Sequence, residues 1–364
     1  MIVETGAGFS LPARRIPGVV YHELKLPFHR ALFTRFHPLF ASLLTCLAGH
    51  RHAAVERLAA GFQAGAVLTV AHGFGWSTAA AVAARRPAAL HLIIHDDWPT
   101  CSSVPAPFRK FVHRELGRVY RQARSRFCAS SFMRADYAAR YGSAATQLYP
   151  SRAAGAVEFA GPPGRVRHQL QKPVVFFGGT INTAGYARSL HDMAGILAEL
   201  NGRLVIHGPY GPDDAARLGL NLPNIEFRGL VSPEELLQRQ RSEADILFIP
   251  MSFAPEDREN MRRGFPSKLA DCTAAGLPIL IQGPPDCSAV CWARENRGVA
   301  EVVDQPQKET LKAAVLRLVS DAEHRWKTAV AGAQAGARDF SHAGAYAIFI
   351  DGLTRSTGCP HDEL

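Results

Sequence analysis

The chain has 364 residues, 47% of them hydrophobic, with a mean hydropathy of −0.05, and these values are typical of a globular protein with two domains. Its formal charge of +9 and pI near 9.4 favour anionic partners, such as an anionic small molecule or an anionic membrane surface, without naming one. The sequence lacks zinc fingers, aromatic sheet motifs and helix-turn-helix patterns, so no nucleic acid partner is expected.

The lack of export and membrane-span signals favours a location in the cytoplasm, with a peripheral position on the inner face of a membrane as the alternative. No apolar run approaches the length of a membrane span, and the first residues lack the basic and apolar regions of a signal peptide. The seven cysteines lack the spacing of a zinc site or redox pair. The final residues 361–364 spell a retention signal, which we interpret as chance.

The first half of the chain alternates apolar strands with helices and so predicts parallel βαβ units. Strands are expected at 66–70 and 90–94, and the second delivers His95, Asp96 and Asp97 to its carboxyl end. Ligands of open α/β sheets bind at that edge. Ser130 follows a later short strand and could equally cap the helix that begins after it.

A basic helix is expected at 107–126, with phenylalanine, valine, leucine and tyrosine interleaved among its cations at helical spacing. Such a run is usually a solvated face. The alternative is an interfacial helix that attaches the protein to an anionic membrane.

A second run of strands and helices follows a stretch rich in Ala, Gly, Pro and Arg. This stretch places a linker at 156–172. The apolar strand after it ends at Gly178 and Gly179, where backbone without side chains can approach a diphosphate, or simply make a tight turn. A helix from about 184 to 200 then carries Arg188, the nearest base to that turn.

The most informative segment is 265–281, which predicts a loop, a short helix and a buried strand. Ser267 is suited to the helix N-cap, while Gly276 and Pro278 end the helix. A phosphate at this N-terminus would meet free backbone N–H groups and the ammonium of Lys268. Asp271 lies one turn further along the helix, about 6 Å away, which suits a ribose diol.

At these residues the chain resembles the nucleotide-sugar-dependent glycosyltransferases of the GT-B fold, in particular the retaining enzymes of family 4. The motif acidic-Ala-Met-Ala-x-Gly-x-Pro-Val of that family aligns with residues 271–279, and its frequent Pro-Ser-Lys-Leu aligns with 266–269. Arg263 stands where the family often has a glutamate that acts at the sugar. Thr180 and Ile181 replace an arginine and a lysine that usually follow the glycine turn.

The resemblance implies an α/β protein of two Rossmann-like domains facing a central cleft, with a C-terminal helix that crosses back to the first domain. The expected parts are an acceptor-side domain at 1–155, the linker at 156–172, a nucleotide-sugar domain at 173–338, the crossover helix at 339–356 and a tail at 357–364. The glycine loop expected after the first strand falls at 5–8.

The resemblance also implies transfer of a sugar, of the hexosyltransferase kind, from a nucleoside-diphosphate sugar to a hydroxyl of a glycan, lipid-linked group or protein. Retention, no catalytic metal and no cofactor beyond the co-substrate are expected. His95 is the catalytic candidate, and Asp96, Asp97, Ser130 and Arg263 are further candidates. The expected donor-binding residues are Gly178, Gly179, Arg188, Ser267, Lys268, Leu269 and Asp271.

Two other functions fit the same residues. Arg263 and the missing basic pair favour a catalytically silent GT-B module that binds a partner or an anionic surface. A GT-B epimerase would act on the nucleotide sugar itself and need no acceptor. Structural interpretations also exist for Asp96 and Asp97 as helix caps, and for Asp257 and Glu259 as loop residues exposed to solvent.

Overall fold

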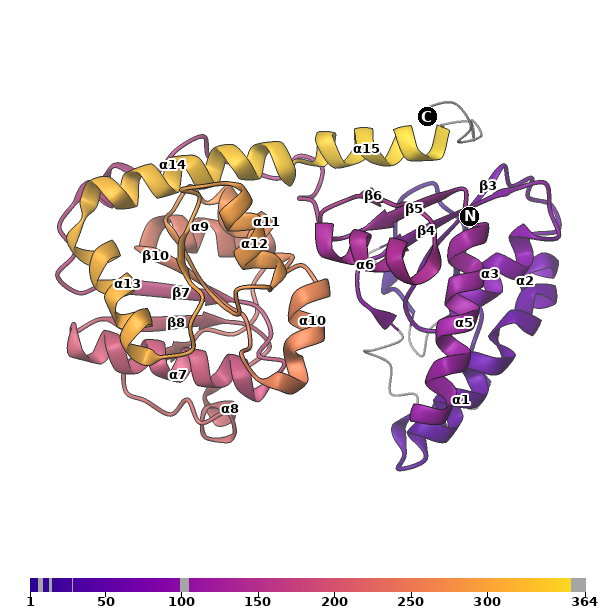
Figure 1. Ribbon diagram of the computed structural model, residues 1–364, viewed down its shortest axis with the longest axis horizontal. Helices are drawn as coiled ribbons and strands as arrows, with labels where there is room; N and C mark the ends of the chain where they lie inside the picture. The colour runs from indigo at the N-terminus through magenta and orange to yellow at the C-terminus, as the bar shows by residue number, and fades with distance from the viewer. Residues whose placement is uncertain (6–8, 13–14, 28, 99–104, 355–364) are drawn as a thin grey trace. The chain divides into compact units, whose positions relative to one another are not determined.

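The computed structural model describes residues 1–5, 9–12, 15–27, 29–98 and 105–354. The chain divides into two compact units (Figure 1), unit 1 formed by Met1–Leu148 with Ile348–Leu364 and unit 2 by Tyr149–Ala347. The glycine loop expected at 5–8 lies, apart from Thr5, outside the described residues, as does the tail expected at 357–364.

Unit 1 is built on a parallel four-stranded sheet in the order β3-β4-β5-β6. Its strands are β3 (Ala66–Val70), β4 (Ala89–Ile94), β5 (Ser125–Cys128) and β6 (Thr146–Gln147). A separate parallel pair joins β1 (Ile2–Glu4) to β2 (Tyr21–Glu23). Its helices include η2 (His29–Phe33), α1 (His37–Leu47), η3 (Ala48–Arg51), α2 (His52–Leu58), α3 (Gly75–Ala83), α5 (Ala106–Gln122) and α6 (Ser131–Tyr141).

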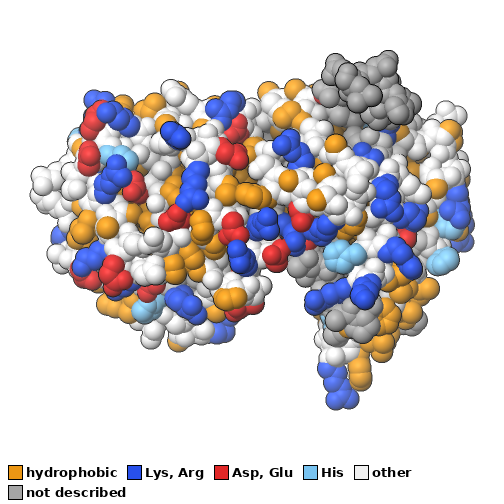
Figure 2. All heavy atoms as spheres, in the orientation of Figure 1, with side chains coloured by type: hydrophobic (Ala, Val, Ile, Leu, Met, Phe, Trp, Pro, Cys, Tyr) orange, Lys and Arg blue, Asp and Glu red, His pale blue; other side chains and the backbone are white. Residues whose placement is uncertain are grey.

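The apolar side chains of α5 belong to the core of unit 1. Val112, Leu116, Val119 and Tyr120 are fully buried in a cluster with residues of α3 and β4. The structure does not support the interfacial helix expected at 107–126, because most of the apolar side chains that would enter a membrane are buried in this core, although Phe108 is 40% exposed. Basic side chains such as Arg114 and Arg121 remain exposed, and Figure 2 shows Lys and Arg spread over the face drawn. No helix among the described residues is both long and apolar enough to span a bilayer.

Unit 2 is built on a parallel six-stranded sheet in the order β12-β11-β10-β7-β8-β9. Its strands are β7 (Val174–Gly178), β8 (Arg203–His207), β9 (Ile225–Phe227), β10 (Ile246–Pro250), β11 (Ile279–Gln282) and β12 (Glu301–Val303). After β7 the chain adds β8 and β9 on one side and β10, β11 and β12 on the other. The strand order thus reverses between β7 and β10, where open α/β sheets bind their ligands.

Helices α7 and α9 of unit 2 begin at side-chain caps. Thr183 accepts a hydrogen bond from the backbone N–H of Tyr186 at 3.4 Å, and Ser232 accepts one from that of Glu235 at 3.1 Å. Both caps fix helices that approach β7 and β10. The helices are α7 (Ala184–Glu199), α8 (Pro212–Arg217), α9 (Pro233–Glu243), α10 (Arg258–Arg263), α11 (Lys268–Ala274), α12 (Ser288–Glu295), α13 (Lys308–Ser320) and α14 (Ala322–Asp339).

Helix α15 (His342–Thr354) follows α14, and its last turns group with unit 1. The Phe349 ring lies 5.4 Å from the Phe127 ring, centroid to centroid, and a Cβ built on Gly352 would fall 2.5 Å from Phe127 Cζ. The absence of a side chain at Gly352 therefore lets this helix approach β5 closely.

Helices α11 and α14 pack closely through small residues. A Cβ built on Gly336 would fall 2.3 Å from Thr273 Cβ and 2.6 Å from Arg152 Nη2. Arg152 is buried and donates from Nε to the Ala270 carbonyl at 3.0 Å and from Nη2 to Thr273 Oγ1 at 2.8 Å. These contacts fix the helix that carries Lys268 and Asp271.

We expect Gly336→Ala to lower the free energy of unfolding by about 1 to 3 kcal/mol, because its methyl group would overlap Thr273 and Arg152. Gly195→Ala in α7 is the matched control, since there a methyl would meet only the end of the flexible Lys308 side chain. The control should be neutral or more stable by up to about 1 kcal/mol. Chemical denaturation of the two variants checks this, and equal stabilities would contradict the packing argument.

Candidate functional site

Three of the expected donor-binding residues of unit 2, Gly178, Gly179 and Lys268, come together at the carboxyl end of β7. Gly179 has a φ of +133°, a conformation that disfavours side chains, and its N–H donates to the His207 carbonyl at 2.8 Å. A Cβ built on Gly179 would lie 3.3 Å from Lys268 Nζ. The glycine turn and the lysine, which lie about ninety positions apart in the sequence, are therefore in contact at the point where the strand order reverses.

The Lys268 ammonium lies among aromatic rings. Its Nζ is 4.3 Å from the Phe177 ring centroid and 5.2 Å from that of Tyr186. Within the described part of the chain, no carboxylate lies within 4.0 Å of it. Burial lowers the pKa of Lys268 to about 8. A cation with little water and no anionic partner is suited to bind an anion from solution.

Ser267 does not make the cap that its sequence position suggests. It precedes α11 but has helical φ and ψ of −55° and −30°, and its side chain accepts no capping hydrogen bond. That expectation is wrong in its geometry, because the chain is already helical at Ser267. The seven-residue helix α11 thus places Lys268 at its start without a side-chain cap.

Asp271 lies on the adjoining side of α11 and lines a cavity of about 110 Å³. Desolvation raises the pKa of Asp271, and the nearby Arg152 guanidinium opposes the rise. A Cβ built on Gly178 would lie 3.1 Å from Leu236, which also lines this cavity, so the cavity adjoins the glycine turn. The other lining residues come from α9, α11 and the segment 152–157, and include Arg152, Ala156, Val157, Pro233, Leu237 and Gln240.

Three other expected residues lie apart from this group. Arg188 is exposed on α7 and lines a different hollow with Thr183 and His191. Leu269 is fully buried, and its backbone N–H donates to the Pro266 carbonyl at 3.0 Å, so its side chain serves the core. Arg263 forms an ion pair at 2.5 Å with Glu259, which lies one turn earlier in α10. Glu259 therefore pairs with Arg263 within this helix.

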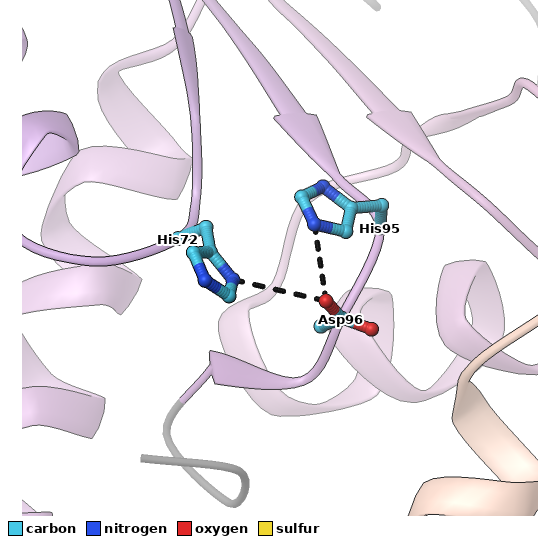
Figure 3. A group of neighbouring side chains, drawn as sticks. All are labelled: His72, His95 and Asp96. Carbon is cyan, nitrogen blue, oxygen red and sulfur yellow. Dashed lines mark ion pairs between the residues drawn. The ribbon is translucent and has the colours of Figure 1, made fainter. Parts of the chain in front are cut away.

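In unit 1, the carboxyl ends of β3 and β4 bring together His72, His95 and Asp96 (Figure 3). Asp96 Oδ2 lies 3.0 Å from His95 Nε2 and 3.7 Å from His72 Nδ1. The two imidazole rings stack with centroids 5.4 Å apart, and the Trp98 ring lies 4.8 Å from that of His72. All three side chains are partly open to solvent and able to meet a ligand.

The Asp96 contact sets the charge of this group. Its hydrogen bond raises the pKa of His95, and His95 in turn lowers the pKa of Asp96. A protonated His95 could donate a hydrogen bond to a hydroxyl or phosphate. The potential ligand atoms of the three residues lie within 4.8 Å of one another, so two imidazoles and a carboxylate could also hold a transition metal ion.

The sequence prediction did not include His72, although a signal for it exists. His72 lies two residues beyond β3, and His95 directly follows β4. Because these parallel strands are neighbours, their carboxyl ends meet at one edge of the sheet.

Asp97 and Ser130 have structural roles. Asp97 is buried and accepts hydrogen bonds from Tyr137 Oη at 2.9 Å and from Arg140 at 3.2 Å. Ser130 is also buried and caps α6 by accepting from the Met133 N–H at 3.1 Å. Neither side chain is presented to a substrate in this arrangement.

Comparison with solved structures finds similar folds at low sequence identity. The α,α-trehalose 6-phosphate synthase of Burkholderia multivorans has a TM-score of 0.65 and 13% identity over 93% of this chain and 86% of its own. The Anabaena protein HepE, solved with UDP and glucose, has a TM-score of 0.60 and 14% identity over 92% and 86%. The sucrose-phosphate synthase of Thermosynechococcus elongatus has a TM-score of 0.61 and 13% identity over 82% and 75%.

These similarities show that the chain has the GT-B fold, with parallel sheets in two Rossmann-like domains, as the sequence predicts. A scan against models of protein families gives no match, and neither does a search of curated protein sequences.

Proposed function

We propose that this protein transfers a sugar from a nucleoside-diphosphate sugar to a hydroxyl acceptor. The observation that carries the proposal is the contact between the half-buried Lys268 side chain and Gly179 of the glycine turn, beside a cavity lined by Asp271. A hexosyltransferase of the retaining family 4, acting without a metal on a glycan, lipid-linked or protein acceptor, is the finer form of the proposal. It rests on the sequence motif at 266–279.

Each part of the donor has a suitable partner in unit 2. The diphosphate would contact the Gly179 backbone and the Lys268 ammonium, which would stabilise the negative charge that develops on the diphosphate as its bond to the sugar breaks. The ribose diol would donate to Asp271, and the nucleoside would occupy the largely apolar cavity beside α9. Structures of HepE, a protein of similar fold, support this assignment. They were solved with UDP, with UDP and glucose, and with UDP-glucose.

In unit 1, His95 would act on the bound substrate, with the Asp96 hydrogen bond favouring the protonated imidazole and fixing its orientation. In a retaining reaction without an enzymic base, the departing diphosphate would accept the acceptor's proton. Asp96 is then a positioning residue, and no nucleophile is assigned.

A metal chelator should leave sugar transfer unchanged, because no catalytic metal is expected. A loss of transfer that Zn²⁺ or Mn²⁺ restores would instead assign a metal to His72, His95 and Asp96.

A thermal-shift panel of UDP, GDP, ADP and dTDP tests the donor site directly. A nucleotide present at about 100 times its dissociation constant stabilises the folded protein by about 2.7 kcal/mol. If none of them raises the melting temperature, the proposed function fails. Stabilisation without turnover of any donor would favour the silent module, which Arg263 already suggests, and an altered sugar formed from donor alone would indicate an epimerase.

We expect Lys268→Ala to weaken nucleoside-diphosphate binding by about 1.5 to 3 kcal/mol, because it removes a charge-assisted contact. Asp271→Asn should also reduce affinity, with little change in melting temperature, because it keeps the side-chain shape but weakens acceptance from the ribose. Titration calorimetry measures both, with Lys312→Ala on the surface of α13 as the control. Unchanged affinity in both folded variants would place the donor elsewhere.

The pKa of Lys268 predicts how binding depends on pH. Bound diphosphate favours the charged ammonium, so binding becomes weaker as pH rises through the value of about 8 found for the empty site. Affinity at pH 8.5 should be about 4-fold lower than at pH 7. Lys268→Ala should lose this dependence, and a wild-type affinity that does not change over the range would show that Lys268 does not bind the phosphates.

His95→Ala should lower turnover by about 10-fold or more and leave nucleotide affinity unchanged, because the interaction it removes is formed mainly in the transition state. Steady-state kinetics and calorimetry together separate the two effects. His191→Ala, an exposed histidine of α7, is the control. Normal turnover in the His95 variant would make this histidine structural.

A further inference from the structure

One face of unit 1 exposes large apolar side chains that its fold does not use. Phe33, Phe36, Leu39, Leu43 and Leu47 have exposed fractions between 39% and 77%. The last four follow at intervals of three or four residues, which places them along one side of α1. We call these five residues the α1 stripe.

The opposite side of α1 is already packed. The buried residues there are Ala41, Leu44, Thr45 and Ala48. The helix therefore packs on unit 1 through these side chains, and the stripe takes no part in that packing. Isolated exposed leucines are common on protein surfaces, whereas a continuous row of five phenylalanines and leucines indicates a partner. In Figure 2, hydrophobic side chains gather with Lys and Arg at the end of unit 1 where Figure 1 places α1.

The charge around the stripe selects the kind of partner. The sequence contains no Asp or Glu from 24 to 55, but it has Lys25, Arg30, Arg35 and Arg51 together with four histidines. Lys25, Arg30 and Arg35 are exposed, and the Arg35 guanidinium lies 4.9 Å from the Phe36 ring centroid. Apolar side chains flanked by cations without acids match the boundary between acyl chains and headgroups of an anionic bilayer.

We propose that the α1 stripe and its flanking cations form a docking surface for an anionic lipid bilayer. The stripe would enter the headgroup boundary, while Lys25, Arg30 and Arg35 contact lipid phosphates. This surface is separate from the donor site in unit 2, so the inference does not depend on the proposed function. It also assigns the membrane contact, which the sequence suggested for 107–126, to α1, where one row of apolar side chains is exposed.

Co-sedimentation with vesicles tests the surface, using phosphatidylcholine alone and phosphatidylcholine with one part in three of phosphatidylglycerol. The wild-type protein should bind the anionic vesicles at least 10-fold more tightly, and less tightly as salt rises. Leu39→Ser with Leu43→Ser should lower that affinity at least 10-fold, and Arg30→Ala with Arg35→Ala several-fold. Both pairs are exposed, so melting temperature and nucleotide binding should match the wild type.

Two control variants make the test specific. Leu230→Ser with Leu316→Ser removes exposed leucines outside the stripe, and Arg114→Ala with Arg121→Ala removes exposed cations of α5. Both should bind vesicles like the wild type. The proposal is overturned if anionic vesicles are not bound at low salt, or if the stripe variants bind as well as the controls. It is also overturned if light scattering finds a dimer that the leucine variants dissociate, since the stripe would then contact a second copy.

Discussion

The placement of one cation away from water is the constraint on which the candidate donor site depends. Lys268 is surrounded by Phe177, Tyr186 and the Gly179 backbone, and desolvation brings its pKa down to about 8. Such a group destabilises the empty protein increasingly as pH falls from the ordinary lysine pKa of 10.5, and the cost is complete below about 8, because the folded state must hold a charge that water would solvate better. A bound anion would replace the interactions with water that the ammonium loses on folding. The free-energy cost of holding this charge in the empty site therefore favours anion binding.

The rest of unit 2 holds that cation in place. The parallel sheet brings the Gly178-Gly179 turn to the reversal of strand order, and Arg152 fixes α11 through Ala270 and Thr273. Gly336 gives α14 room to approach the same helix. One short helix therefore presents Lys268 to the turn and Asp271 to the cavity. Neither position would be defined by α11 alone, because a seven-residue helix is only marginally stable without packing.

Unit 1 shows how similar sequence patterns can have opposite outcomes. Helices α1 and α5 both combine apolar residues with cations, which lie beside α1 but within α5. Most apolar residues of α5 lie in the core, whereas α1 has apolar residues on two sides and exposes those of one side. A sequence gives the spacing of apolar residues around a helix but not which side meets the sheet. That choice depends on contacts between distant segments, which bury the apolar residues of α5 and leave one side of α1 exposed.

The sequence by itself determined the parallel α/β fold, the strands at 66–70 and 90–94, and the helix and buried strand that follow Pro266. Periodicity, glycine turns and a short motif are local signals, and they persist whatever the chain packs against. Only the tertiary structure decided that Asp97 and Ser130 have structural roles, that Arg188 lies away from Lys268, and that His72 joins His95 and Asp96. These outcomes depend on which distant side chains meet at a strand end, and spacing along the chain does not record that.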